Sequence, residues 1–172
     1  MSQAQAATLF LLVVPVLFGL MYLGWRGRAR RQSDVAAPAT APAGVPAGAP
    51  LPEPLLDPVE GVYVSTVRAG DWLDRVVVHG LGVRSPAVLH AGRDGVWFER
   101  RGAPGVFVPA AAVESVRLES GMAGKYTVGE ELLVLRWRSG DAHLDTGFRP
   151  QRWSEASRYA AALQPLVTGG DQ

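Results

Sequence analysis

The sequence predicts a mainly β protein with a helix at each end. Near the N-terminus, residues 6–25 form an uncharged apolar run. Between residues 61 and 148, short runs rich in β-branched and aromatic residues alternate with Gly and Asp, which is the pattern of an antiparallel β-fold. After Pro150, apolar residues recur at helical spacing. We therefore expect a transmembrane helix, then a seven-stranded antiparallel barrel or sandwich, capped by a C-terminal amphipathic helix.

The amino-acid composition excludes several classes of function. With 172 residues, 48% of them apolar, the chain holds one domain of ordinary size and a further segment. It contains no cysteine, which excludes disulfides, thiolate metal sites and a cysteine nucleophile. The net charge is +1, and the excess of basic residues lies near the N-terminus. We expect no nucleic-acid partner, because nucleic-acid binders concentrate basic residues on the folded domain.

Residues 1–25 are predicted to be a membrane anchor. The run AATLFLLVVPVLFGLMYLGW, residues 6–25, has about the 20 residues that a helix needs to cross the hydrocarbon core. Tyr22 and Trp25 lie at its end, where aromatic rings favour the membrane interface. A cleaved signal peptide is the alternative, but the residues before the run lack the basic side chains of a signal peptide.

Four arginines predict the orientation of this anchor. Arg26, Arg28, Arg30 and Arg31 follow the apolar run directly. Because positive flanks are retained on the cytoplasmic side, we expect a single-pass protein of the cell membrane with its C-terminal domain in the cytoplasm. Together with the two aromatic residues, these arginines are the candidate membrane-interface residues.

Residues 26–58 are predicted to be a basic cuff followed by a tether. From Ser33 to Pro58 the chain holds seven prolines and seven alanines, with almost no aromatic residue. Such a segment cannot form a core, and it favours extended polyproline structure with a reach of about 80 Å. We therefore expect the folded domain to begin at residue 59, and a fragment starting near Leu56 to fold alone.

Residues 59–167 are predicted to be the folded domain. The expected strands cover residues 61–69, 72–79, 87–91, 96–100, 105–109, 114–119 and 131–138, with residues 142–148 as an eighth strand or an extension. From Pro150 to Val167 the apolar residues recur at spacings of three and four, so a helix is expected there, with Pro150 in its first turn. Residues 168–172 are expected to be a flexible tail.

The stretches EGVYVSTVRAGDWLDRVVVHGLGVRSPAVL and LDTGFR, with the anchor and the tether, resemble a family of bacterial pleckstrin-homology-like (PH-like) membrane proteins. Its members are single-pass proteins of high-GC Gram-positive bacteria, often labelled as transport or export proteins. The resemblance implies a PH-like barrel. It also implies a genomic context of pyrimidine biosynthesis, which no residue of this chain demonstrates.

Asp145-Thr146-Gly147 spells the signature of aspartic proteases. Phe148 follows where those proteases have Ser or Ala, and too few residues remain for the rest of a protease lobe. We therefore interpret the motif as the end of a strand, where Gly147 permits a turn before the helix.

No metal or cofactor site is predicted. His79, His90 and His143 lack the spacing of zinc ligands and are interpreted as strand residues. Asp71 and Asp74 lie on the first hairpin, where phosphoinositide-binding PH domains carry basic residues, so phosphoinositide binding is not expected.

The function expected from these observations is a non-enzymatic, membrane-tethered module that recruits a cytoplasmic protein or peptide. An enzyme is not expected, because no nucleophile, base and oxyanion set can be assembled. An accessory or regulatory subunit of a membrane transporter is the alternative. The loop at residues 120–129 is long for a hairpin and carries Met122, Lys125 and Tyr126, which suit a protein contact. These three are the candidate partner-binding residues.

Overall fold

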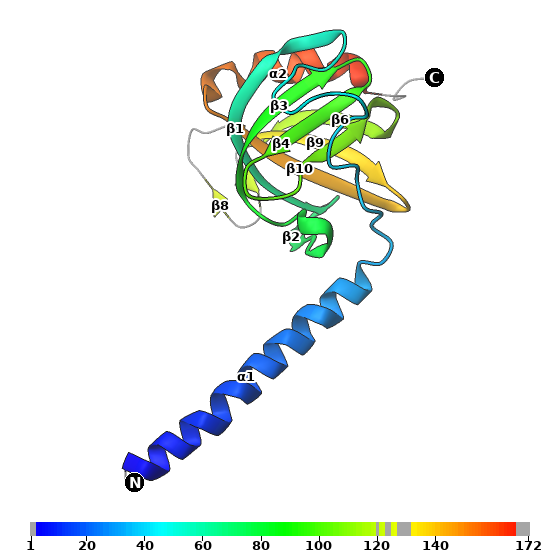
Figure 1. Cartoon of the computed structure of the whole chain (residues 1–172). Helices are drawn as coiled ribbons and strands as arrows, with labels where there is room; N and C mark the ends of the chain where they lie inside the picture. Colours follow the sequence, from blue (N-terminus) through cyan, green and yellow to red (C-terminus); the bar gives the residue numbers. More distant parts are fainter. Residues whose placement is uncertain (1–2, 120, 123–124, 127–131, 168–172) are drawn as a thin grey trace. The chain divides into compact units, whose positions relative to one another are not determined.

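The computed structural model describes residues 3–119, 121–122, 125–126 and 132–167 of the chain. The chain divides into two compact units, residues 1–33 and 34–172. The first unit contains one helix, and the second contains the β-structure and a second helix (Figure 1).

The first unit is the helix α1, Gln3–Arg31, with Pro15 inside it. Its described apolar side chains are exposed along the length of the helix, from Phe10 at 73% to Leu23 at 62%. The predicted helix is therefore present, and it extends through the basic residues that follow the apolar run. Among the residues that the structure describes, no helix combines the length and the apolar content that crossing a membrane requires.

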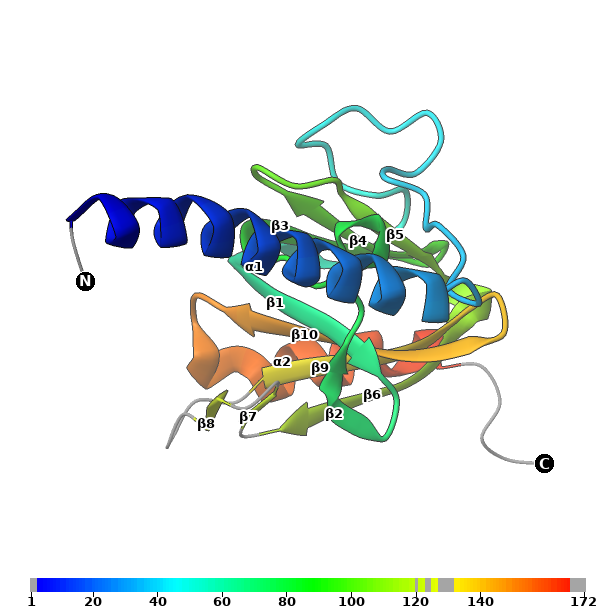
Figure 2. The same cartoon turned by 90° about the horizontal axis from the view of Figure 1, so that it is seen from below.

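The second unit is built on one antiparallel sheet in the order β5-β4-β3-β1-β10-β9-β6, with β2 paired to β1. The sheet is curled around the core (Figures 1 and 2). A separate two-stranded ladder joins β7 to β8. The strands are β1 Pro54–Arg68, β2 Asp71–Arg75, β3 Ser85–Gly92, β4 Gly95–Arg100, β5 Val106–Pro109, β6 Val113–Glu119, β7 Gly121–Met122, β8 Lys125–Tyr126, β9 Leu132–Ser139 and β10 Ala142–Pro150.

The long strand β1 lies between β3 and β10 in the sheet and also pairs with β2. Its first part, from Pro54, pairs with β3, and the part from Gly61 to Arg68 pairs with β10. Register shifts interrupt the β3 pairing near Pro54 and Pro58, and proline is tolerated in strands at such irregularities. The sequence predicted this strand to begin only at residue 61, because its prolines resemble those of a tether.

The other predicted strands are confirmed, with two corrections. The second strand ends at Arg75, and His79 lies in the short 3-10 helix η1, Val78–Gly80, with a φ of 56°. The last strand continues to Pro150, so Gly147 lies inside β10, opposite Val134 of β9. The interpretation of Gly147 as a turn is therefore wrong.

The C-terminal helix is confirmed but shorter than predicted. The helix α2, Ala156–Leu163, follows the 3-10 turn η3, Trp153–Glu155, and leads into η4, Gln164–Leu166. It packs against β1, β6 and β9. Its buried face consists of Ala156, Ala160 and Leu163, as the spacing predicted. Burial of one leucine side chain stabilises the fold by about 1.5–3 kcal/mol.

A chain of hydrogen bonds crosses the interior of the barrel. Trp137 Nε1 donates to Thr146 Oγ1 at 2.9 Å, and the hydroxyls of Thr146 and Thr66 are 2.8 Å apart. The hydroxyls of Thr66 and Tyr63 are 2.5 Å apart, and the Tyr63 hydroxyl donates to the Leu81 carbonyl at 3.1 Å. All four side chains are thereby satisfied within an apolar core.

Residues 34–53, which we call the strap, differ from the free tether that their composition predicts. Val35 and Leu51 are buried, and Val35 forms an isolated β-bridge with Gly140. A second bridge joins Ala39 to Phe107 of β5. The strap belongs to the second compact unit and runs beside β4 and β5 (Figure 2). The folded unit therefore begins at Asp34 rather than at residue 59.

Candidate functional site

The predicted partner-binding loop lies partly outside the described residues. Met122 of β7 pairs with Lys125 of β8, and Gly121 pairs with Tyr126. The described residues of this loop therefore form a two-stranded antiparallel ladder. The side chains of Met122, Lys125 and Tyr126 are outside the described part of the structure, so their role as a partner site stays a prediction.

The predicted membrane-interface residues lie on the last turns of α1. The Tyr22, Arg26, Arg30 and Arg31 side chains are exposed, and Arg26 donates to the Tyr22 hydroxyl at 3.4 Å. The side chains of Trp25 and Arg28 are outside the described part. The aromatic ring and the first arginine therefore lie together one turn apart, at the C-terminal end of the apolar run.

The Asp145 carboxylate of the Asp-Thr-Gly motif is held by two arginines. Arg136 donates to it at 2.8 and 2.9 Å, and Arg117 donates at 2.8 and 3.3 Å. Asp145 is 5% exposed, whereas the two arginine side chains are 31% and 35% exposed. Thr146, the next residue of the motif, belongs to the internal hydrogen-bond chain. The Asp145 and Thr146 side chains of the motif therefore have a structural role in the folded domain.

The electrostatics of this cluster keep Asp145 ionised. Burial alone raises the pKa of a carboxyl group, but hydrogen bonds from Arg136 and Arg117 outweigh that effect and hold the pKa of Asp145 below its ordinary value. A protease dyad instead needs two carboxyl groups that share a proton. In the described structure, the groups that contact this carboxylate are guanidiniums.

The three histidines lie apart from one another. His90 Nε2 contacts Glu99 at 2.9 Å, His143 Nδ1 contacts Glu114 at 2.8 Å, and His79 Nε2 contacts the Val35 carbonyl at 3.0 Å. Across the described residues, no three His, Cys, Asp or Glu side chains are grouped as a metal site requires.

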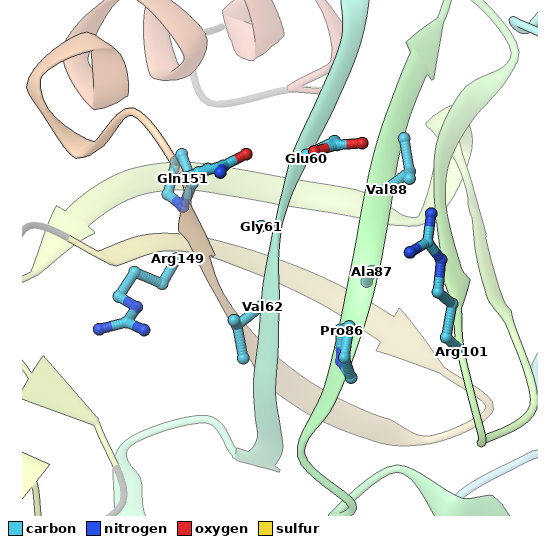
Figure 3. Close-up of a pocket in the computed structure, with 10 residues that line it drawn as sticks. Glu60, Gly61, Val62, Pro86, Ala87, Val88, Arg101, Arg149 and Gln151 are labelled. Carbon is cyan, nitrogen blue, oxygen red and sulfur yellow. The ribbon is translucent and has the colours of Figure 1, made fainter.

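A groove on the outer face of the sheet is a candidate binding site. It has a volume of about 400 Å³ and crosses β1 between β3 and β10. Val62, Pro86 and Val88 contribute apolar surface to it. Figure 3 shows Arg101 and Arg149 on opposite sides of the groove, with Glu60 and Gln151 toward one end.

Strand pairing explains why these residues lie together. Val62 lies opposite Pro86 on one side and opposite Arg149 on the other, so the three form a row across the sheet. Arg101 follows the last residue of β4, and its backbone N–H donates to the Pro86 carbonyl at 2.9 Å. The two arginines are 48 positions apart in the chain, and only the pairing of β1 with both neighbours brings them to one groove.

Sequence reasoning missed this groove. The sequence contains one relevant signal, the alternation of buried and outward-facing residues along each strand. Glu60, Val62 and Arg149 occupy outward positions next to the buried residues Tyr63 and Phe148. That pattern assigns a face to each strand but does not say which strands are neighbours.

Comparison with known proteins identifies the domain. A family model described as bacterial PH domain-like matches residues 39–164. This protein belongs to the bacterial PH domain-like family. The match begins inside the strap and ends inside the turn that follows α2, so it covers the barrel, its capping helix and most of the strap. The PH-like resemblance noted from the sequence is confirmed for this part of the chain.

Two further comparisons add little to this PH-like assignment. No curated protein matches the chain. A solved structure described as "The 8S snRNP Assembly Intermediate" contains a chain that is 9% identical, with a TM-score of 0.49 over 72% of this chain and 94% of that chain.

Proposed function

We propose that this protein is a membrane-anchored, non-enzymatic PH-like module that recruits a cytoplasmic protein to the membrane by binding an acidic segment of it. The observation that carries the proposal is the outer-face groove with an arginine on each side. The partner identity is open, and both a soluble enzyme, for example of pyrimidine biosynthesis, and a transporter subunit are candidates.

The anchoring part of the proposal is supported by α1. Its apolar side chains are exposed along the described length, from Phe10 to Leu23, and such a surface is unfavourable in water. A helix that is apolar on all sides is expected to be buried in a protein or in a bilayer. The exposed Arg26, Arg30 and Arg31 at its end favour a cytoplasmic position for the domain.

The binding part is supported by the chemistry of the groove. Arg101 and Arg149 line the groove, and guanidiniums bind carboxylates through paired N–H donors. Val62 and Val88, half-buried between them, provide apolar contact for the aliphatic parts of a peptide. Glu60 is exposed toward one end and disfavours a second carboxylate there. The groove therefore suits a segment whose acidic residues lie next to the arginines.

Affinity capture from detergent-solubilised membranes tests this function. The full chain should retain a partner, and the double variant Arg101→Glu/Arg149→Glu should lose it by at least tenfold because the groove then repels acidic residues. Arg158→Glu, an exposed position on α2 outside the groove, makes the same charge reversal as each single replacement and should retain the partner. Equal capture by the double variant contradicts the groove as the site.

The captured protein also distinguishes the two classes of partner. A soluble protein supports recruitment to the membrane, whereas a polytopic membrane protein favours the accessory role in a transporter. A single helix cannot form a transport path by itself, so the second role requires such a partner.

A further inference from the structure

The strap lies against glycines of the barrel at three places. A Cβ added to Gly105 would lie 2.1 Å from the Thr40 carbonyl oxygen, and one added to Gly92 would lie 2.6 Å from the Pro52 carbonyl oxygen. A Cβ at Gly140 would lie 3.0 Å from the Asp34 carbonyl oxygen. At Gly105 and Gly92 any other residue would therefore displace the strap backbone, and at Gly140 it would make an unusually tight contact. The barrel surface fits the strap at both ends and in the middle.

The middle contact is a binding site for extended backbone. The Phe107 N–H, on the outer edge of β5, donates to the Ala39 carbonyl at 2.7 Å. The next strap carbonyl, that of Thr40, accepts from Trp97 Nε1 at 3.1 Å and lies against Gly105. Two consecutive carbonyls are thus recognised by two donors of the barrel.

A second part of the same surface binds a strap N–H. The backbone N–H of Gly48 donates to the Glu99 carboxylate at 2.9 and 3.1 Å. Glu99 also contacts His90, whose ring stacks on Trp97 with a centroid separation of 4.9 Å. Trp97 and His90 are almost completely buried although they lie on strands near the edge of the sheet. A buried aromatic pair therefore supports the donors and the acceptor of the site.

The contacts of the strap with this surface are mostly made by its backbone. Between Ala39 and Gly48 every residue is uncharged, and most of these side chains are exposed. The buried apolar anchors, Val35 and Leu51, lie outside this stretch. The Asp34–Arg68 ion pair at the beginning of the strap is partly exposed, so it contributes little to stability. Another extended segment with the same backbone geometry could make the same contacts.

We propose that the β5 edge, with Trp97, Glu99 and Gly105, is a second binding site of this domain. The strap fills this site in cis, and an extended, uncharged, proline-containing segment of another protein fills it after displacing the strap. The class of ligand is read from residues 39–48, the occupant in the structure. The site shares no lining residue with the Arg101–Arg149 groove but adjoins it, because Glu99 of β4 pairs with Val88 of β3.

A disulfide lock provides the first test, because the chain contains no cysteine. Ala39 and Phe107 are bridge partners, and paired strand residues lie within the Cα separation that a disulfide needs. The full chain carrying Ala39→Cys and Phe107→Cys is titrated with a labelled peptide of residues 34–53, up to millimolar concentrations because the strap competes in cis. The reduced chain should bind the peptide and the oxidised chain should not. Equal behaviour of the two forms, including no binding to either, overturns the proposal.

A released strap provides the second test. The full chain with Val35→Asp and Leu51→Asp loses both apolar anchors and should bind the same peptide at least tenfold more tightly than the unchanged chain. Adding Gly105→Ala should reverse this gain, because its Cβ occupies the position of the Thr40 carbonyl. Gly27→Ala in α1, whose Cβ meets no atom within 4 Å, is the matched control and should leave the gain intact. A folded released variant that does not bind the peptide contradicts the proposal.

Two further experiments distinguish this site from two alternatives, which are binding of the peptide in the groove and exchange of the strap between copies of the chain. Arg149→Glu, on the side of the groove opposite Arg101, should leave peptide binding unchanged, whereas a loss in that variant would place the peptide in the groove. Chains carrying only Ala39→Cys, co-expressed with chains carrying only Phe107→Cys, should form no disulfide between copies. A cross-linked dimer would show instead that the strap of a second copy is the occupant.

Discussion

At the residue scale, the internal polar groups of the barrel depend on one another. Thr146 accepts from Trp137 and shares a hydrogen bond with Thr66, which in turn contacts the Tyr63 hydroxyl. Since the Tyr63 hydroxyl donates to the Leu81 carbonyl, one consistent direction of donation runs from Trp137 to that carbonyl. Loss of one hydroxyl therefore removes one hydrogen bond from each of its two neighbours.

Thr146→Val tests this dependence. Valine has nearly the same shape, but the Trp137 N–H loses its acceptor and the Thr66 hydroxyl loses one of its two partners in the core. We expect the free energy of unfolding to fall by roughly 1–3 kcal/mol. Urea denaturation followed by tryptophan fluorescence measures the change. Ser157→Ala, an exposed position on α2, serves as the control and should stay within about 0.5 kcal/mol.

The second prediction at this scale concerns Asp145 and pH. Asp145→Asn removes the charge that faces Arg117 and Arg136, and it should lower the free energy of unfolding at pH 7 by roughly 1–3 kcal/mol, less than for a fully buried pair because the arginines are partly exposed. The folded-state pKa of Asp145 is lowered, so its contribution is present above the unfolded pKa of about 3.9 and is lost as the pH falls through the folded value.

The difference between the native chain and Asp145→Asn should therefore be constant from pH 7 to about pH 5 and shrink below pH 4. Thermal unfolding of both chains across this range measures it. A difference that grows on acidification would show that the sign assigned to this group is wrong. Peptidase activity that disappears with the substitution would reopen the catalytic interpretation of the motif.

At the element scale, β1 shows how much of this fold the sequence predicts. The β-rich runs at residues 61–148 predicted the strands, because alternation and turn residues are local signals. The beginning of β1 was missed, since Pro54 and Pro58 favour a tether when read alone. They are tolerated there because β10 pairs only from Gly61 onward, which leaves this part of β1 without a partner on that side.

The strap and the groove were missed for a related reason. The alanines and prolines of the strap contain no signal for docking, because the complementary features are glycines at positions 92, 105 and 140 in other elements. Likewise, Arg101 and Arg149 become neighbours of one groove only through strand pairing. Properties that depend on contacts between distant segments are absent from local patterns.

Gly61→Ala tests the close approach of β1 and β10. A Cβ at this position would lie 2.3 Å from the Arg149 carbonyl oxygen and 2.6 Å from Phe148 Cζ, so backbone has to move. We expect a loss of about 1–3 kcal/mol in stability and a weakened groove, since both strands line it. At Gly102 an added Cβ meets no atom within 4 Å, and only its positive φ of 77° opposes alanine. Gly102→Ala should therefore cost about 1 kcal/mol by calorimetry and leave partner capture unchanged.

At the scale of the whole molecule, the chain combines an apolar helix with a PH-like unit that begins at Asp34. The boundary matters because Val35 and Leu51 are each only 2% exposed in the folded unit. A fragment that starts near Leu56, as the composition of the tether suggests, lacks both side chains and the Thr40 carbonyl that accepts from Trp97 Nε1.

A fragment of residues 34–172 should therefore be more stable than a fragment of residues 56–172. Loss of two buried aliphatic side chains, partly offset by the freedom that the strap gains, should lower the melting temperature by roughly 5–15 °C. Differential scanning calorimetry of both fragments at equal concentration provides the comparison. Identical melting temperatures would show that the strap adds no stability to the barrel.

Membrane topology is the remaining prediction at this scale. Since Arg26 to Arg31 follow the apolar run, a C-terminal fusion to alkaline phosphatase should be inactive in intact cells, and a C-terminal fluorescent protein should be bright. Replacement of the four arginines by glutamine should increase phosphatase activity if they determine orientation. Phosphatase activity in the unchanged chain would place the domain on the outer side.

The strap is synthesised before the surface that it binds. The chain emerges from the ribosome N-terminus first, so α1 and the strap are made before any part of the surface that receives the strap. The Ser139 hydroxyl, which donates to the Ala36 carbonyl at 2.8 Å, is added 103 residues later. The partners of the middle of the strap, Trp97, Glu99 and Phe107, are made earlier in that interval. The contact with Ser139, which completes docking of the strap, can form only when most of the barrel has left the ribosome.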